Sequence, residues 1–83
     1  MTNIVKVFSA KWCPSCGPYK ESLDKAGIEY ISLDADLDAH QDEFRKYNIR
    51  GLPTTVVVIQ ETGELVRQIV GSVPVSEVKK YVS

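Results

Sequence analysis

Two cysteines separated by two residues are the part of this sequence best suited to carry chemistry. Cys13 and Cys16 are the only cysteines in the 83 residues, and they flank Pro14 and Ser15. A pair at this spacing on a helix can form a disulfide, pass between oxidised and reduced states, or supply half of a metal site. Two cysteines are too few for a disulfide scaffold, so we expect redox or metal chemistry here.

A zinc site would need ligands that this sequence hardly offers. Structural zinc takes four ligands, and the only histidine, His40, lies far along the chain in a helical pattern. We therefore expect no resident metal and no cofactor. A metal ion or iron–sulfur cluster shared between two copies of the chain remains an open alternative.

A strand before the pair and a helix after it would position the two cysteines. Residues 4–9 are apolar and β-rich, which predicts a strand. Tyr19, Leu23 and Ala26 recur at helical spacing before Gly27, which predicts a helix from the cysteine motif to about residue 26. The motif therefore lies where a strand has ended and a helix begins.

This placement predicts different roles for the two thiols. We expect Cys13 to cap the helix and Pro14 to occupy its first position, where a missing N–H costs nothing. Unpaired N–H groups and the helix dipole would then favour a Cys13 thiolate, lowering its pKa from the usual value of about 8.5. Cys13 is the expected nucleophile, and Cys16, farther inside the helix, is the expected resolving thiol. Pro18 lacks an N–H and is expected to distort the first turns.

The remaining sequence predicts an alternation of strands and helices. An aspartate, Asp36 or Asp38, is expected to cap the second helix, and Val75, Val78 and Val82 are expected to face inward from the last one. The run from 54 to 59 is almost continuously apolar, as in a central strand buried on both faces. The predicted elements are strands at 28–33, 54–59 and 65–70, a hairpin turn at 61–64, and helices at 36–47 and 74–82.

The order β-α-β-α-β-β-α predicts an α/β fold. A helical crossover makes the first two strands parallel, and a hairpin makes the last two antiparallel. We expect a mixed four-stranded sheet with three helices on its two faces, forming a single domain over residues 1–83.

Composition and charge exclude several classes of partner. The formal net charge is −1, and the 10 lysines and arginines are scattered, so we expect no nucleic-acid partner. No apolar run approaches the roughly 18 residues of a membrane span. The sequence beginning at Met1 has no signal-peptide pattern, so we expect a cytoplasmic protein that does not bind membranes.

Together these features resemble the thioredoxin superfamily over essentially the whole chain. The segment AKWCPSC (10–16) follows an apolar strand, NIRGLPT (48–54) precedes a β-branched strand, and a hairpin around Gly63 leads to Val70-Gly71 and a last helix. Full-length thioredoxins begin with an extra strand and helix, so the resemblance implies the trimmed thioredoxin fold, as in glutaredoxins.

The resemblance also implies roles for residues around the pair. It implies a cis peptide bond between Leu52 and Pro53, beside the cysteines, with the Leu52 backbone pairing with an extended substrate segment. Trp12 would be an exposed contact for partner proteins, and Gly71 would leave room for substrate. With Pro14, these residues form the expected substrate-binding set.

Two departures from the family concern Cys16. Thioredoxins carry a buried aspartate in the strand before the motif and a partner lysine in the next strand, and here Val7 and Tyr30 correspond to them. Proton transfer at Cys16 therefore lacks its usual carboxylate, and water or another group must serve. Pro14 and Ser15 replace the family's Gly-Pro, which leaves the redox potential open.

The expected function is thiol–disulfide exchange. Cys13 attacks a substrate disulfide, and Cys16 then attacks the Cys13 sulfur and releases the reduced substrate. The expected partners of this monomer are disulfide-containing proteins and an electron donor, either glutathione or an NADPH-dependent flavoprotein reductase. The alternatives are a glutathione-dependent, glutaredoxin-like reductase, a non-catalytic binding module, and a dimeric metal- or cluster-binding protein.

Overall fold

The computed structural model describes residues 2–82, in which strands and helices alternate along most of the chain. One turn of 3₁₀-helix at Asp38–His40 leads directly into the second α-helix. The elements are β1 (Asn3–Ser9), α1 (Cys16–Lys25), β2 (Ile31–Asp34), α2 (Gln41–Lys46), β3 (Thr54–Ile59), β4 (Leu65–Val70) and α3 (Val75–Lys79).

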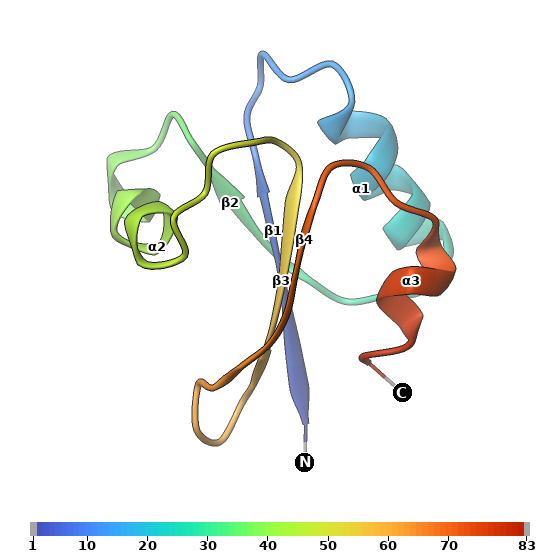
Figure 1. Ribbon diagram of the computed structural model, residues 1–83. Helices are drawn as coiled ribbons and strands as arrows, with labels where there is room; N and C mark the ends of the chain where they lie inside the picture. The colour runs from blue at the N-terminus through green and yellow to red at the C-terminus, as the bar shows by residue number, and fades with distance from the viewer. Residues whose placement is uncertain (1, 83) are drawn as a thin grey trace.

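The strands form one mixed sheet in the order β2-β1-β3-β4. β1 is parallel to β2 and antiparallel to β3, and β3 is antiparallel to β4. Helices α1 and α3 cover one face of the sheet and α2 covers the other (Figure 1). The predicted α/β fold, with a mixed four-stranded sheet and three helices, is confirmed.

Neighbouring residues of β1 supply the cores on the two faces, because side chains alternate along a strand. Val7 packs with Tyr19 and Leu23 of α1 on one face. Phe8 points to the other face, where its ring meets Phe44 edge-on at 4.8 Å between centroids. The two cores fix both helices against β1, at whose C-terminal end the cysteine motif begins.

Helix α1 starts later than the sequence predicts. The helix begins at Cys16 with Ser15 at its cap, so Cys13 is not the cap and Pro14 is not its first residue. Pro18 explains the difference, because it has no N–H to bond the carbonyl four residues back. The bond from the Tyr19 N–H to the Ser15 carbonyl, 3.2 Å, is the first of this type that the chain forms there. Pro18 thus delays the helix.

The end of α1 also moves the start of β2. The N–H of Gly27 bonds the Asp24 carbonyl, and the N–H of Ile28 bonds the Leu23 carbonyl at 3.0 Å. These two bonds, with Gly27 at a φ of +73°, form a Schellman cap. Ile28 is therefore committed to the helix end, and the strand predicted at 28–33 instead runs over Ile31–Asp34.

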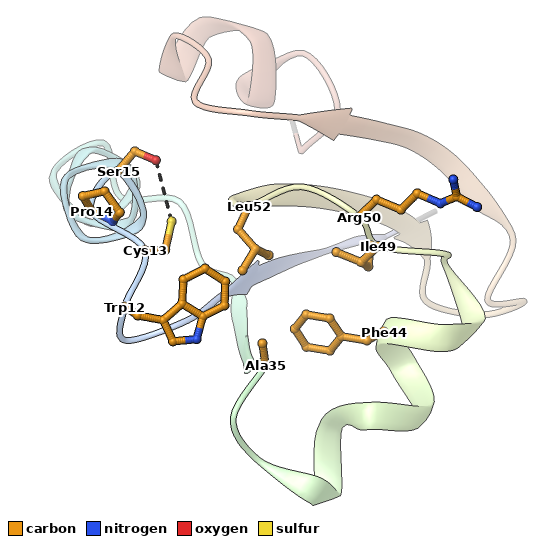
Figure 2. Close-up of a pocket in the computed structure, with 9 residues that line it drawn as sticks. All are labelled: Trp12, Cys13, Pro14, Ser15, Ala35, Phe44, Ile49, Arg50 and Leu52. Atoms are coloured by element: carbon orange, nitrogen blue, oxygen red, sulfur yellow. Dashed lines mark hydrogen bonds between the residues drawn. The ribbon is translucent and has the colours of Figure 1, made fainter.

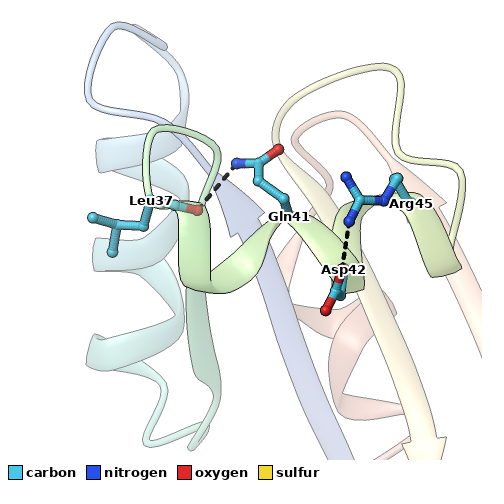
Figure 3. A network of polar contacts seen from close by, with 4 residues as sticks. All are labelled: Leu37, Gln41, Asp42 and Arg45. Atoms are coloured by element: carbon cyan, nitrogen blue, oxygen red, sulfur yellow. Dashed lines mark hydrogen bonds and ion pairs between the residues drawn. The ribbon is translucent and has the colours of Figure 1, made fainter.

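No aspartate caps the second helix. The 3₁₀ turn before α2 has Leu37 at its cap position, and no side chain bonds its N–H groups. The Gln41 amide instead holds the segment in place, because it donates to the carbonyl oxygen of Leu37 (Figure 3). The same amide also donates to the carbonyl oxygen of Ala35. Asp42 forms an ion pair with Arg45 on the outer side of α2. The predicted aspartate cap is wrong because side chain–backbone bonds after the turn replace it.

The two hairpin strands, β3 and β4, have the bounds predicted from the sequence. The last helix is shorter than predicted and ends at Lys79. The N–H groups of Tyr81 and Val82 bond carbonyls three residues back, so the chain continues as tight turns. As a result Val82 is exposed, whereas Val78 is fully buried as predicted.

Candidate active site

Cys13 and Cys16 are joined by a disulfide at the start of α1. Their Cα atoms are 5.5 Å apart, within the ordinary range for such a bridge. Cys13 is 8% exposed and Cys16 is 2% exposed, so Cys13 is the more accessible residue of the pair. The pair packs against Ala10, Ala35 and Leu52, which surround it with apolar groups.

Ser15, one of the two residues between the cysteines, brings a hydroxyl group close to Cys13. Its Oγ lies 3.7 Å from the Cys13 Sγ, and because a bridged sulfur carries no hydrogen, the hydroxyl is the donor (Figure 2). The same hydroxyl can donate to a thiolate once the bridge is reduced. A hydrogen bond to the charged form of an acid favours that form. Ser15 is therefore placed to stabilise a Cys13 thiolate.

An apolar groove of about 410 Å³ opens beside Cys13. Figure 2 shows Trp12, Phe44, Ile49 and Leu52 around this space, with Arg50 at its edge. The wall contributed by α2 and the loop after it lies opposite the cysteine motif. This shape suits an extended polypeptide that brings a disulfide to Cys13.

Trp12 lies at the mouth of this groove and is 67% exposed. Its indole N–H donates to a carboxylate oxygen of Asp36 over 3.2 Å. Asp36 belongs to the loop after β2, so this contact joins the cysteine motif to a distant segment. The prediction that Trp12 is an exposed aromatic beside the cysteines, not a core residue, agrees with this position.

The loop before β3 lies beside the cysteine pair, as predicted. The Leu52–Pro53 peptide bond is cis, Leu52 lines the groove and Pro53 is buried. Gly71, with φ at +92°, donates its N–H to the Pro53 carbonyl over 2.7 Å. Gly71 therefore contacts the proline loop and is not among the residues that line the groove.

The environment of Cys16 differs from the prediction in one respect. Val7 is fully buried, but the strand register places Ser32 opposite it, and Tyr30 lies before β2 begins. The strand register therefore places Ser32, and not Tyr30, opposite Val7. Tyr30 lies in the segment between the Schellman cap and β2.

Tyr19 and Tyr30 contribute no charge to the site at neutral pH. Burial raises the pKa of Tyr19 above its ordinary value of 10.0, and the hydrogen bond with Thr55 lowers it in part. Burial also raises the pKa of Tyr30, and its hydrogen bond and charge interaction with Asp24 raise it further. Both phenols therefore stay neutral.

Several groove residues were not predicted from the sequence. Ile49 and Arg50 belong to the NIRGLPT motif, just before the Leu52–Pro53 bond. Their position in this motif could have indicated that they line the groove. Phe44 and Ala35 gave no such signal, because only the packing of α2 and the end of β2 brings them to Cys13.

The described residues contain neither a cluster of metal-binding side chains nor a membrane-spanning helix. Within residues 2–82, no three histidine, cysteine, aspartate or glutamate side chains lie close enough together to hold a metal ion. Across the same residues, no helix combines the length and the apolar character needed to cross a membrane.

The chain is similar to known proteins both in sequence and in fold. The family described as Thioredoxin matches residues 2–83. Thioredoxin 2 of Plasmodium falciparum is 34% identical over 65 residues, which cover 74% of this chain and 41% of that protein. The thioredoxin of Mycoplasmoides gallisepticum is 28% identical over 81 residues, which cover 94% of this chain and 79% of that protein.

A solved structure agrees with the fold. The crystal structure of the Malassezia sympodialis thioredoxin superposes with a TM-score of 0.82 at 20% identity, over 99% of this chain and 76% of that one. At this identity the likeness concerns the fold alone, whereas the family match covers nearly every residue. The chain belongs to the thioredoxin family, and Cys13 and Cys16 are its dithiol–disulfide oxidoreductase pair.

Proposed function

We propose that this protein is a thioredoxin-like electron donor that reduces disulfides in other proteins. The observation that carries the proposal is the bridged pair, in which Cys13 is the more accessible residue and borders an apolar groove. A non-catalytic binding module would have no need of two cysteines at bridging distance. The proposal covers the substrates and donors as well as the chemistry.

The proposed cycle begins with Cys13 as the nucleophile. Its thiolate attacks one sulfur of the substrate disulfide, forms a mixed disulfide and expels the other substrate sulfur as a thiolate. Cys16, deprotonated in turn, attacks the Cys13 sulfur and expels the second substrate sulfur. Two electrons have then passed from the cysteine pair to the substrate, and the Cys13–Cys16 bridge awaits a reductant.

The groove is the proposed substrate site. We assign Trp12, Pro14 and Leu52 to direct contact, because all three line it beside Cys13. The backbone of Leu52 would pair with an extended substrate segment, as an added strand pairs with a sheet edge. Pro53 and Gly71 would support this loop from behind, through the bond between the Gly71 N–H and the Pro53 carbonyl.

Membership of the thioredoxin family implies disulfide-containing protein substrates and a reductase as partners. We further propose that the protein acts as a monomer and as one domain, with an NADPH-dependent flavoprotein reductase rather than glutathione as donor. We also propose a cytoplasmic location, where a disulfide in a protein with so few cysteines is typically transient and catalytic. Side-by-side reduction by the two donors tests the first of these choices.

Reduction of insulin by dithiothreitol tests the proposed activity. The wild-type protein is expected to accelerate precipitation of the insulin B chain, and Cys13→Ser is expected to abolish the acceleration. Ser22→Ala serves as the matched control, because Ser22 lies on α1 and its hydroxyl bonds only the Pro18 carbonyl. An unchanged rate in Cys13→Ser would contradict the assignment of the nucleophile.

A further inference from the structure

A second cavity, of about 230 Å³, reaches the cysteine pair between α1 and the sheet. Cys13 borders both cavities, but Cys16 lines only this smaller one among the two. Two oppositely charged side chains, Lys20 and Asp34, line it as well. Cys16 therefore shares this cavity with charged side chains of both signs.

Lys20 is held in this cavity by two hydroxyl groups of the sheet. Its Nζ donates to Ser9 Oγ of β1 and to Ser32 Oγ of β2, each over 3.3 Å. Ser9 is almost fully buried, so the ammonium lies against the sheet surface and does not extend freely into solvent. Lys20 also follows Cys16 by four residues, which places both on one face of α1.

The bond to Ser32 shows over which part of the sheet the Lys20 ammonium lies. The strand register sets Ser32 opposite Val7, a fully buried apolar residue that packs against Tyr19 and Leu23 of α1. Lys20 bonds Ser32 from the helix side, so α1 delivers a positive charge to a region of the sheet that has none from β1.

We propose that Lys20 is a positioning residue that stabilises the Cys16 thiolate during release of the substrate. A positive charge near an acid favours the ionised form, and the effect grows where the cavity excludes part of the solvent. The inference rests on the proposed function, because it concerns the second step of that cycle.

The proposed step balances as follows. In the mixed disulfide, the Cys16 thiol loses its proton to solvent, and the resulting thiolate is stabilised by the Lys20 ammonium. The thiolate attacks the Cys13 sulfur, the Cys13–Cys16 bond forms, and the bond from Cys13 to the substrate breaks. The substrate sulfur leaves with the electron pair and takes a proton from solvent. Lys20 itself forms and breaks no covalent bond.

Other charges around the cavity give the proposal a sign test. Asp34, at the end of β2, opposes the effect of Lys20, and its carboxylate accepts the Asp36 N–H over 2.8 Å. Lys11, in the turn before Cys13, is the remaining charged residue that lines this cavity. Tyr19, which is buried on the same helix, stays neutral because burial raises its pKa. Removal of Lys20 and removal of Asp34 must therefore shift ionisation of Cys16 in opposite directions.

Stopped-flow reaction of the reduced protein with one equivalent of dithiobis(nitrobenzoate) separates the two steps. Attack by Cys13 releases the first thionitrobenzoate, and attack by Cys16 on the mixed disulfide releases the second. For Lys20→Met we expect the pH midpoint of the second phase to rise by about one unit, while the first phase keeps its rate. At neutral pH the thiolate fraction then falls about tenfold and its greater basicity recovers about threefold, so the second phase slows about threefold.

Three further variants complete the experiment. Lys20→Arg should keep the second-phase midpoint of the wild-type protein. Asp34→Asn should lower that midpoint, because it removes a negative charge near Cys16. The asparagine oxygen can still accept the Asp36 N–H, so the local structure is kept. Lys25→Met is the matched control, because Lys25 lies on α1 but is exposed and pairs with Glu21 at 3.2 Å. A thermal melt of each variant verifies folding.

The outcomes separate the two proposals. If the wild-type protein releases both equivalents but Lys20→Met and Asp34→Asn leave the second-phase midpoint unchanged or move it the same way, the role of Lys20 is refuted. If Lys20→Met does not fold, the second-phase midpoints of Asp34→Asn and Lys20→Arg are used instead. A midpoint in Asp34→Asn that does not fall, or one in Lys20→Arg that differs from the wild-type value, then refutes the role of Lys20. If the wild-type protein releases no second equivalent, the proposed function itself fails.

Discussion

The indole N–H of Trp12 donates to the carboxylate of Asp36 over 3.2 Å, which connects the residue before Cys13 to the loop after β2. The indole is largely exposed, so this bond sets its orientation at the mouth of the groove and adds little to the stability of the fold. An aromatic held in one orientation contacts a partner at a lower cost in side-chain entropy than a mobile one.

Asp36→Ala should release this indole. We expect kcat/KM for insulin reduction to fall about twofold to fivefold, the effect of losing one exposed hydrogen bond of about 0.5–1 kcal/mol. Trp12 is the only tryptophan, so its fluorescence anisotropy reports the added motion. Asp38→Ala removes a nearby carboxylate, at the start of the 3₁₀ turn, that does not line the groove, and it should change neither quantity. Equal effects from both variants would show that loop charge, not the bond, matters.

Ser15→Ala should slow the first step of the reaction. The Ser15 hydroxyl lies 3.7 Å from the Cys13 sulfur and is placed to stabilise its thiolate. We expect the pH midpoint for alkylation of Cys13 by iodoacetamide, measured in a Cys16→Ser background, to move to higher pH. Ser22→Ala on the same helix should leave the midpoint in place. A midpoint that is the same in Ser15→Ala and its parent would show that the hydroxyl does not reach the thiolate.

The stability of the oxidised protein should fall at alkaline pH because the pKa values of the Tyr19 and Tyr30 phenols are raised in the fold. Burial raises the pKa of Tyr19 above 10.0 in the folded state. The stability that this group contributes is therefore fully present below the unfolded value of about 10 and is lost as pH rises through the folded value. Urea unfolding at about pH 8 and about pH 11 measures the loss. Tyr19→Phe should reduce it and leave the part due to Tyr30, whereas an unchanged loss would contradict the assignment.

The core between α1 and the sheet should be sensitive to truncation. Leu23 is fully buried against Val7, so Leu23→Ala is expected to lower the free energy of unfolding by about 3 kcal/mol. Leu65→Ala is the matched control, because Leu65 begins β4 and is about half exposed. Its expected cost is below about 0.5 kcal/mol by urea denaturation. Comparable losses in the two variants would show that this core is not packed as described.

Local signals explain which elements could be predicted from the sequence. β3 and β4 have their predicted bounds, because a β-branched run and a hairpin turn around Gly63 are encoded in adjacent residues. The start of α1 was predicted too early, although the missing N–H of Pro18 explains why the helix begins only at Cys16. Counting which N–H groups can reach a carbonyl four residues back gives Cys16 as the first helical residue.

The contacts of the site depend on tertiary packing and could be predicted only in part. The resemblance to the thioredoxin superfamily implied that the Leu52–Pro53 loop lies beside the cysteine pair, and Leu52 does pack against it. The strand register that sets Ser32 opposite Val7 depends on where the helix before β2 ends. The bonds of Lys20 likewise join a helix to two strands. No periodicity within one segment indicates such pairings.

In the proposed cycle, Cys13 attacks the substrate disulfide and Cys16 resolves the mixed disulfide that forms. Peptide mapping by mass spectrometry, after the Cys16→Ser protein reacts at neutral pH with a disulfide-bonded peptide, tests this claim most directly. We predict that Cys16→Ser accumulates one mixed disulfide, on Cys13, and that Cys13→Ser forms none over the same time. Equal labelling of Cys16 in the Cys13→Ser protein would contradict the assigned order of attack.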